Sequence, residues 1–443
     1  MRERLPHSST ISAGQSSSSA RSLAPLFVLF LVNVLNFYDR QALGAILEPL
    51  RREFRLSDTQ LGLLTTSFTV VYALAGVPLG RLADTWRRKR LLAMGTAVWA
   101  ALTGLGGLAA GYGVLLFTRL GVGVGEAVCA PAATSWIGDV APAERRARAM
   151  AWFMMAVPVG GMLSFAVTGP VAQAHGWRVA LALAALPAAA LIPALLLLRE
   201  PLRASGPETV PGQADGSWAA LWKIPAFWWM VASGAVVNFV LYSFSTFLPA
   251  FLTRFHGLTV ARAGLWTGIG TGVAGIAGAL AAGWFGDRVS TRRGRARMRL
   301  SAGAALAAAP LAFLAIRMPA GRAAVAVPLL MAAYGLLQSY YGLVYAAMQD
   351  IVGPGLRGAA MGTYFMAMYL CGASFGPVVT GGFSDRFARM AAGAGPVTEA
   401  ARALGLREAM YLIPALCAAL AAVLWAGART MDEASPPESG ARP

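Results

Sequence analysis

The 443-residue chain is 57% hydrophobic and only 13% charged, and its mean hydropathy is +0.58. A soluble domain usually carries about a quarter charged residues, so water is not the main solvent of this protein. The formal net charge of +17 would indicate nucleic-acid binding in a soluble chain, but basic loops facing anionic lipid headgroups explain it better here. We therefore expect an integral membrane protein without a nucleic-acid partner.

Apolar runs long enough to cross a bilayer recur along nearly the whole chain. A helix of about 20 apolar residues spans a hydrocarbon core of ~30 Å. The predicted spans are residues 24–48, 58–81, 90–110, 113–138, 147–171, 177–198, 225–253, 262–286, 299–317, 323–349, 357–384 and 407–428. The fold class is therefore predicted to be an all-α polytopic membrane protein of 12 transmembrane helices.

Polar stretches divide the chain into parts. We expect a disordered cytoplasmic tail (1–22), an N-terminal six-helix bundle (23–199), a cytoplasmic linker (200–223), a C-terminal six-helix bundle (224–430) and a cytoplasmic tail (431–443). With the N-terminus inside, cytoplasmic segments carry about twice as many Lys and Arg residues as outer loops, which follows the positive-inside rule. Both termini are thus predicted to be cytoplasmic. The Ala-, Gly- and Arg-rich composition favours a bacterial inner membrane, and we expect a monomer.

Patterns of metal, cofactor or catalytic chemistry are not recognisable in the sequence. Cys129, Cys371 and Cys417 all lie within predicted spans and offer no metal-ligand spacing. Residues 270–275 satisfy the GxGxxG pattern, but they lie inside a predicted span with no preceding strand, so helix packing explains these glycines better. We expect no enzyme activity, no cofactor and no metal.

The ends of the second and eighth spans show an internal repeat. Gly80 and Asp84 have the same spacing as Gly283 and Asp287, and a basic cluster follows each pair. Transporters built from duplicated units typically show weak repeats of this kind. The repeat therefore predicts two pseudo-symmetric bundles.

A second correspondence lies around the fourth and fifth spans, where one constant shift maps Asp139 onto Asp350 and Arg146 onto Arg357. Asp84 and Asp287, at the ends of the second and eighth spans, can accept hydrogen bonds from a helix N-terminus or from an arginine across the interface of the halves. A solvated charge at a helix end is the alternative, and the second copy favours a gate. The predicted cytoplasmic gate comprises Gly80, Asp84, Arg88, Asp139, Arg146, Asp287 and Arg357.

Four ionisable residues, Asp39, Arg40, Arg119 and Glu126, lie far from either membrane surface. A charge near the bilayer centre costs at least ~2.5–3.5 kcal/mol and persists mainly where it functions. Moving an arginine away from a buried carboxylate changes how tightly the carboxylate holds a proton, and a guanidinium binds phosphate or carboxylate bidentately. We interpret Asp39 and Glu126 as proton-coupling residues, and Arg40, Arg119 and Asn36 as substrate-binding residues. A static ion pair that fixes helix packing is the alternative.

The second half offers amide and aromatic groups instead of intramembrane charges. Asn238 and Tyr242 lie in the seventh span, and Gln338 and Tyr341 lie in the tenth. A cavity with charge on one wall and aromatic surface on the other suits an amphiphile, so these four are predicted substrate-binding residues. Each aromatic can equally serve packing or anchor the helix at the interface.

Residues 80–90 resemble the loop signature of the major facilitator superfamily, although Arg87 stands where that family usually has a second glycine. The resemblance covers about residues 24–430 and implies the major facilitator fold. Within this superfamily, residues 36–40, 56–64, 121–127 and 156–160 resemble the Spinster family. The matching functional positions are Asp39, Arg40, Arg119 and Glu126.

The resemblance to the Spinster family implies a secondary active transporter, proton-coupled, that moves an amphiphilic anionic lipid such as a lysophospholipid or sphingosine 1-phosphate. The partners expected are the lipid bilayer, protons and an amphiphilic or anionic small molecule. A proton-coupled symporter of small organic anions, such as sugar acids, is the alternative, because an intramembrane Asp-Arg pair also resembles that group. A multidrug exporter is the third candidate.

Overall fold

The computed structural model describes residues 13–201, 221–288, 294–353 and 356–431, and these residues form helices and turns without a strand. In the first half the helices are α1 (Ala13–Phe54), α2 (Asp58–Thr85), α3 (Arg88–Gly106), α4 (Tyr112–Glu126), α5 (Cys129–Val140), α6 (Ala143–Met154), α7 (Ala156–His175), α8 (Trp177–Ala185) and α9 (Ala188–Leu197). In the second half they are α11 (Pro225–Arg254), α12 (Val260–Arg288), α13 (Gly294–Arg317), α14 (Ala323–Ile351), α15 (Arg357–Ala367), the π-helical segment η2 (Met368–Ala373), α16 (Phe375–Ala392), α17 (Glu399–Met410) and α18 (Leu412–Thr430).

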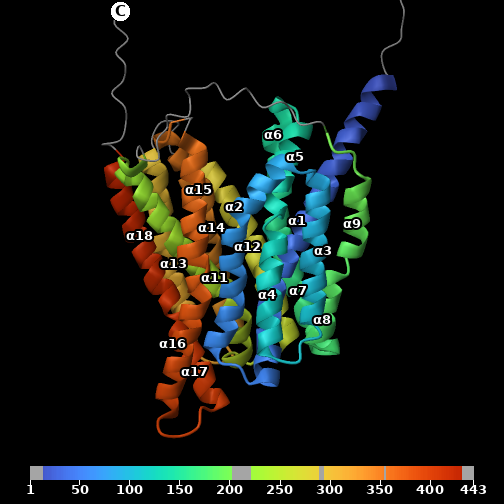
Figure 1. The fold of residues 1–443 in the computed structure, drawn as a ribbon. Coiled ribbons are helices and arrows are strands. Elements are labelled where there is room, and N and C mark those ends of the chain that lie inside the picture. The colour runs from blue at the N-terminus through green and yellow to red at the C-terminus, as the bar shows by residue number, and fades with distance from the viewer. Residues whose placement is uncertain (1–12, 202–220, 289–293, 354–355, 432–443) are drawn as a thin grey trace, which may run out of the picture.

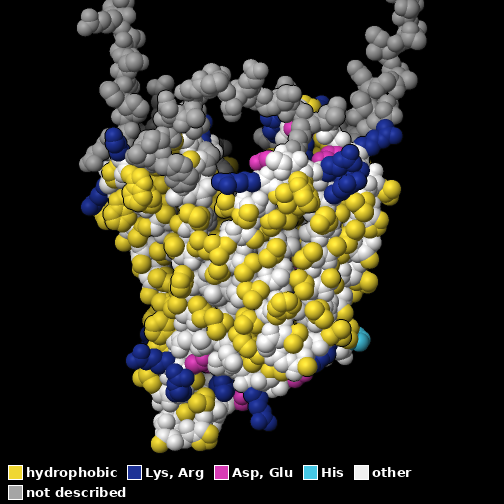
Figure 2. Space-filling model, in the orientation of Figure 1, with side chains coloured by type: hydrophobic (Ala, Val, Ile, Leu, Met, Phe, Trp, Pro, Cys, Tyr) yellow, Lys and Arg dark blue, Asp and Glu magenta, His cyan; other side chains and the backbone are white. Residues whose placement is uncertain are grey.

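Eleven stretches of helix among the described residues are long and apolar enough to cross a membrane. Some of them join two labelled helices, as α4 and α5 do over Tyr112–Val140. The predicted span at 90–110 corresponds to α3, which has 19 residues, begins with charged side chains and packs against α4, α8 and α9. Hydrophobic side chains form a broad belt around the molecule, and Lys and Arg side chains gather at its two ends (Figure 2).

The helices are arranged as two bundles that meet along a few helices (Figure 1). Helix α12 packs on α7, α16 packs on α2, and α1 packs on α11. Glycines allow this close approach, because a Cβ added to Gly62 would lie 2.4 Å from the Pro377 carbonyl oxygen and one added to Gly268 would lie 2.6 Å from the Met162 carbonyl oxygen. The close packing of the two halves therefore depends on glycines at their interface.

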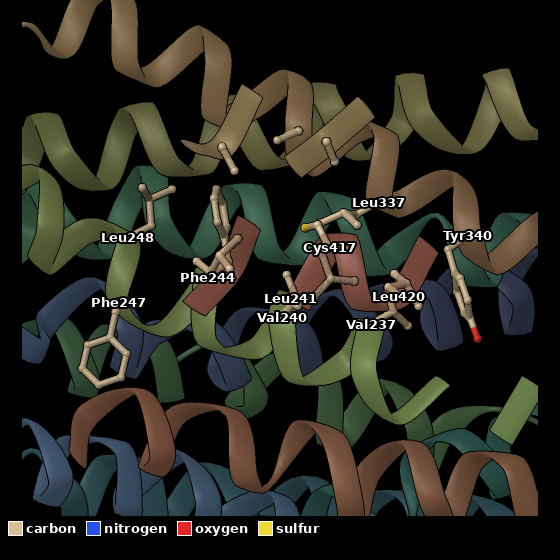
Figure 3. Packing of buried hydrophobic residues seen from close by; sticks show 14 of the residues in the cluster. Val237, Val240, Leu241, Phe244, Phe247, Leu248, Leu337, Tyr340, Cys417 and Leu420 are labelled. Carbon is tan, nitrogen blue, oxygen red and sulfur yellow. The ribbon is translucent and has the colours of Figure 1, made fainter. Parts of the chain in front are cut away.

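Helix α11 is the most buried of the long helices, with 78% of its most apolar window inside the molecule. Its Val237, Leu241 and Phe244 belong to one hydrophobic cluster with Cys417 and Leu420 (Figure 3). Helix α11 also contacts α1, so this buried cluster lies just behind the face that meets the first half.

Both described chain ends lie at one face of the molecule, at the top of Figure 1. We call it the terminal face, and the face at the bottom the opposite face. Helix α1 begins at Ala13, so residues 13–22 are helical where a disordered tail is predicted. The rest of that tail, residues 202–220 of the predicted linker and residues 432–443 of the C-terminal tail lie outside the described residues.

The eleventh and twelfth spans continue past their predicted limits at the opposite face. Helix α16 runs on to Ala392, and α17 begins at Glu399, so the two form a projecting helical hairpin (Figure 1). Charged residues interrupt the apolar pattern there, which is why the sequence predicts a loop. Gly405 allows the two helices to cross closely, because its Cβ would lie 2.5 Å from the Ser384 carbonyl oxygen.

Candidate functional site

Arg40 of α1 and Glu126 of α4 form an ion pair in the middle of the first bundle. Arg40 Nη2 lies 3.1 Å and Arg40 Nε 3.2 Å from Glu126 Oε2. The side chains are 3% and 0% exposed, so the pair is shielded from bulk water. Arg40 Nη2 also lies 3.4 Å from Asn36 Oδ1, one turn earlier on α1. Asn36 and Arg40 of α1 thus face the glycine-rich part of α4.

Asp39 and Arg119, the other two intramembrane charges, share Thr103 of α3 as a partner. The Thr103 hydroxyl donates to Asp39 Oδ2 at 2.8 Å, and Arg119 Nη2 donates to the Thr103 Oγ1 atom at 3.3 Å. Asp39 is 1% exposed and Arg119 4% exposed. The structure therefore brings all four predicted charges together, and it adds Thr103, which the sequence does not single out because a threonine in a span is commonplace.

A small cavity of about 20 Å³ lies beside these charges, between the two halves of the chain. Its walls include Arg40 and Arg119 from the first half and Tyr242, Ser245 and Thr246 of α11 from the second. This volume holds about one water molecule. Both arginines therefore border a cavity between the bundles, and a change in the relative position of the bundles would enlarge or close it.

Arg40 also lies against aromatic rings. Its guanidinium carbon is 4.3 Å from the ring centre of Tyr72, 4.7 Å from that of Phe37 and 5.3 Å from that of Phe68. The Tyr72 ring contacts Tyr369 of η2 across the interface, with the ring centres 5.5 Å apart. Cation–π contacts of this kind offset part of the cost of burying the charge.

Four buried polar atoms at this site make no hydrogen bond with a described residue. The atoms are Asn36 Nδ2, Asp39 Oδ1, Arg40 Nη1 and Glu126 Oε1. A buried polar atom without a partner costs roughly 1–3 kcal/mol. If these residues served packing alone, their polar atoms would be expected to have hydrogen-bond partners. The unpartnered atoms therefore favour a site that binds a substrate or a proton.

Of the residues predicted on the second half, Tyr242 reaches the cavity beside Arg40. The other three form two separate hydrogen-bonded pairs: Tyr341 donates to Asn238 Oδ1 at 3.2 Å, and the Gln338 amide donates to the Tyr334 hydroxyl at 3.0 Å. Gln338 Oε1 is buried without a described partner. Asn238 lies on α11, and Tyr334, Gln338 and Tyr341 lie on α14. Helix α14 packs against α11, which in turn contacts α1 of the first half.

Among the residues of the predicted gate, ion pairs at the terminal face form within each half. Arg88 donates to Asp139 Oδ2 at 2.5 Å in the first half, and Asp350 pairs with Arg297 at 2.7 Å in the second. Arg357 donates to the carbonyl oxygens of two residues on its own side. No described ion pair joins the halves at this face, and the space-filling view has a notch there between the bundles (Figure 2). Gly80 is half-buried, Asp84 and Arg146 are exposed, and the Asp287 side chain lies outside the described residues.

The opposite face is closed by an ionic group that the sequence does not reveal. Glu48 of α1 accepts from Arg51 at 2.7 Å and from Arg254 of α11 at 2.6 Å. Arg254 also lies 2.9 Å from Asp58 Oδ2 at the start of α2. Two halves of the chain are therefore joined by charges that are almost fully buried.

The helical hairpin of α16 and α17 completes this closure. The Asp385 carboxylate accepts from the backbone N–H groups of Asp58 and Thr59 at 2.9 and 2.8 Å, so it caps α2 from the other half of the chain. Glu399 accepts from Arg51 at 2.5 Å. We call this group the latch; it comprises Glu48, Arg51, Asp58, Arg254, Asp385 and Glu399. In the sequence, the latch residues appear only as charged residues at the ends of predicted spans. Charged residues that are simply exposed to solvent give the same pattern, so the sequence does not predict the latch.

Comparison with known proteins places these features in a family. The profile of the Major Facilitator Superfamily matches residues 29–377. An MFS-type efflux pump of Mycolicibacterium smegmatis is 32% identical over 410 residues, which cover 90% of this chain and 92% of that protein. Protein spinster homolog 1 of Homo sapiens is 28% identical over 394 residues, which cover 84% of this chain and 75% of that protein.

Solved structures with the same arrangement include a bacterial homologue of the human lysosomal transporter Spinster. In its inward-facing and unoccupied conformation it matches with a TM-score of 0.85 at 26% identity, over 95% of this chain and 99% of that one. Its inward-facing and occupied conformation matches with a TM-score of 0.79 at 26% identity, over 93% and 98% of the two chains.

Proposed function

The chain belongs to the major facilitator superfamily, and we propose that it carries an amphiphilic anion across the membrane by alternating access coupled to protons. The resemblance to the Spinster family and the expected helical fold are confirmed by the relatives and solved structures described above. Like those relatives, the protein is a transporter and not an enzyme. The identity of the substrate and the coupling of its transport to protons are what we propose.

The observation that carries the proposal is the position of Arg40 and Arg119 on the wall of a cavity between the two halves. Each arginine is tied to groups of the first half, and the facing wall belongs to the second half. An anion bound there would contact both halves at once. Rocking the halves about such a site exposes it to one side and then the other.

Charge balance supports coupling to protons. The guanidinium groups of Arg40 and Arg119 and the carboxylates of Asp39 and Glu126 carry no net charge together when all four are ionised. A proton on Glu126 weakens its pair with Arg40 and leaves one positive charge beside the cavity, which an anionic substrate neutralises. Proton and anion then favour each other's binding, and this reciprocal linkage is the basis of coupled movement. Asp39 is the second proton-coupling residue that we propose, because it shares Thr103 with Arg119.

We assign the terminal face to the cytoplasm because the basic loops gather there, and we place the protein in a bacterial inner membrane as a monomer. In the conformation described, the latch holds the outer side closed. When it opens, the predicted cytoplasmic gate residues would meet across the interface and close the inner side. Arg88 and Asp139, which pair within the first half, are proposed to take part.

The substrate that we favour is a single-chain anionic lipid of the lysophospholipid or sphingosine 1-phosphate kind. Arg40 and the Tyr72 ring in the first half, with the Tyr242 and Tyr369 rings in the second, suit a charged head and an apolar chain. Small organic anions carried with protons are the alternative, since Arg40 and Arg119 alone would hold them. Export of drugs is a further candidate, because the relative of 32% identity is an efflux pump.

The test uses purified protein in proteoliposomes, with flux of lysophospholipid, sphingoid phosphate and small carboxylate measured at two pH values. We expect Glu126→Gln to abolish the pH-gradient dependence of flux while the protein stays folded, and Arg119→Ala to weaken substrate binding. Glu408→Gln is the matched control, because Glu408 is 46% exposed and lies away from the site. Unchanged gradient-dependent flux in both site variants would refute the assignment. Competition by single-chain phospholipids favours the lipid, and rescue by a soluble carboxylate favours the alternative.

A further inference from the structure

A single π-helical turn, η2, interrupts the long helix between α15 and α16 at the level of the interface. The backbone N–H of Ser374 donates to the carbonyl oxygen of Tyr369 at 2.9 Å, five residues earlier, and the Ser374 hydroxyl donates to the same oxygen at 2.9 Å. Such turns cost helix regularity and are frequent at functional sites. The turn changes the direction in which Tyr369 points relative to a continuous α-helix.

The first half of the chain holds this turn in place. The Thr66 hydroxyl of α2 donates to the carbonyl oxygen of Ser374 at 2.5 Å. This contact crosses the interface between the halves, and it satisfies a carbonyl group next to the π-helical turn. Ser374 and Thr66 together therefore determine where Tyr369 lies.

Tyr369 belongs to a group of three tyrosines around Arg40, which we call the phenol collar: Tyr72, Tyr242 and Tyr369. The ring centre of Tyr369 is 5.5 Å from that of Tyr72 and 6.4 Å from that of Tyr242. All three phenols are close enough to Arg40 to interact with its charge. Arg40 Nη1 is buried without a hydrogen-bond partner among the described residues.

We propose that Tyr369 is a specificity-determining residue, whose hydroxyl binds the anionic group of the substrate together with Tyr242 and Arg40 Nη1, and that Ser374 and Thr66 are its positioning residues. The inference rests on the proposed function, because it requires an anionic substrate at Arg40. Phenol hydroxyls donate hydrogen bonds without adding charge, so they select for acceptor oxygens on the substrate. The collar draws on both halves, so a bound anion would hold them together.

The experiment measures binding to the full chain in lipid nanodiscs with two probes that share one acyl chain. The probes are 1-oleoyl lysophosphatidic acid, which carries a phosphate, and 1-oleoylglycerol, which does not. We expect Tyr369→Phe to weaken the phosphate probe roughly tenfold to a hundredfold, as the loss of a hydrogen bond to a charged group does, and to leave the neutral probe unchanged. Ser374→Ala should weaken the phosphate probe to a smaller degree.

Tyr411→Phe is the matched control, since Tyr411 joins α17 to α18 and its hydroxyl meets only Arg407 among its described hydrogen-bond partners. Helix content and thermal unfolding establish that each variant is folded. The inference is overturned if Tyr369→Phe binds the phosphate probe as the parent does, or if it weakens both probes equally, as a packing role would. A parent protein that does not prefer the phosphate probe overturns the proposed anionic substrate as well, so the two failures are distinguishable.

Discussion

The Arg254 Nε atom lies 2.6 Å from Glu48 Oε2, and this contact joins the second half of the chain to the first at the opposite face. The two side chains are only 2% and 4% exposed. An exposed pair contributes at most about 1 kcal/mol, whereas removing one partner of a buried pair costs about 3–5 kcal/mol. Removing either side chain would therefore leave an uncompensated buried charge at this contact between the halves.

We predict that Glu48→Gln loosens the opposite face. Arg254 would keep Asp58, and Arg51 would keep Glu399, so the protein should remain folded. Hydrogen–deuterium exchange of peptides that cover the start of α2 should become faster, because the Asp385 cap would open more often. Arg52→Gln is the control, since the Arg52 side chain is 65% exposed and its pair with Glu48 should contribute little. Equal exchange in the parent and in Glu48→Gln contradicts a latch.

A second prediction concerns the packing of α2 on α16. A Cβ at position 62 would lie 2.4 Å from the Pro377 carbonyl oxygen, which belongs to backbone and cannot rotate away. Gly62→Ala should therefore lower stability by about 1–3 kcal/mol, read as a lower unfolding temperature. Gly76→Ala on the same helix meets open space and should be neutral or slightly stabilising. Similar melting of the two variants would show that the halves are not held at this distance.

Thr103→Val tests the bridge between Asp39 and Arg119. Valine has nearly the same shape but neither donates to Asp39 nor accepts from Arg119. The loss should be about 1–3 kcal/mol of stability, and the pH profile of transport should change, since a proposed proton site loses a partner. Thr118→Val is the control, because the buried Thr118 hydroxyl bonds only within its own helix among its described partners. A pH profile that stays the same in both variants argues that Thr103 serves packing alone.

Arg88→Gln separates gating from packing at the terminal face. Arg88 is 1% exposed and pairs with Asp139 and Glu200 in the first half. We expect lower thermal stability, and also slower transport at a temperature where the variant is fully folded, because the inner side would close less well. Arg81→Gln, at an exposed position on the neighbouring helix, should leave both quantities near those of the parent. Normal transport by folded Arg88→Gln would assign this arginine to packing.

Hydropathy and charge in the sequence were sufficient to predict an all-helical membrane protein, the approximate spans and the four intramembrane charges. These features depend on local composition, because a helix that crosses a bilayer must be apolar along most of its length. A charged residue within such an apolar stretch is therefore recognisable in the sequence. The resemblance to the Spinster family also depended on short local motifs, and the relatives confirm it.

The pairing of those charges was decided only by the tertiary structure. Arg119 and Glu126 lie seven residues apart in one predicted span, but this spacing did not indicate that Glu126 would pair with Arg40 or that Thr103 would join Asp39 to Arg119. The contact of Asp385 with the start of α2 links residues that are far apart in the sequence. A hydroxyl from α2 likewise contacts the backbone next to the π-helical turn at Tyr369. Such contacts follow from how the helices pack in three dimensions, and no local pattern along the chain records which partner a buried polar group will meet.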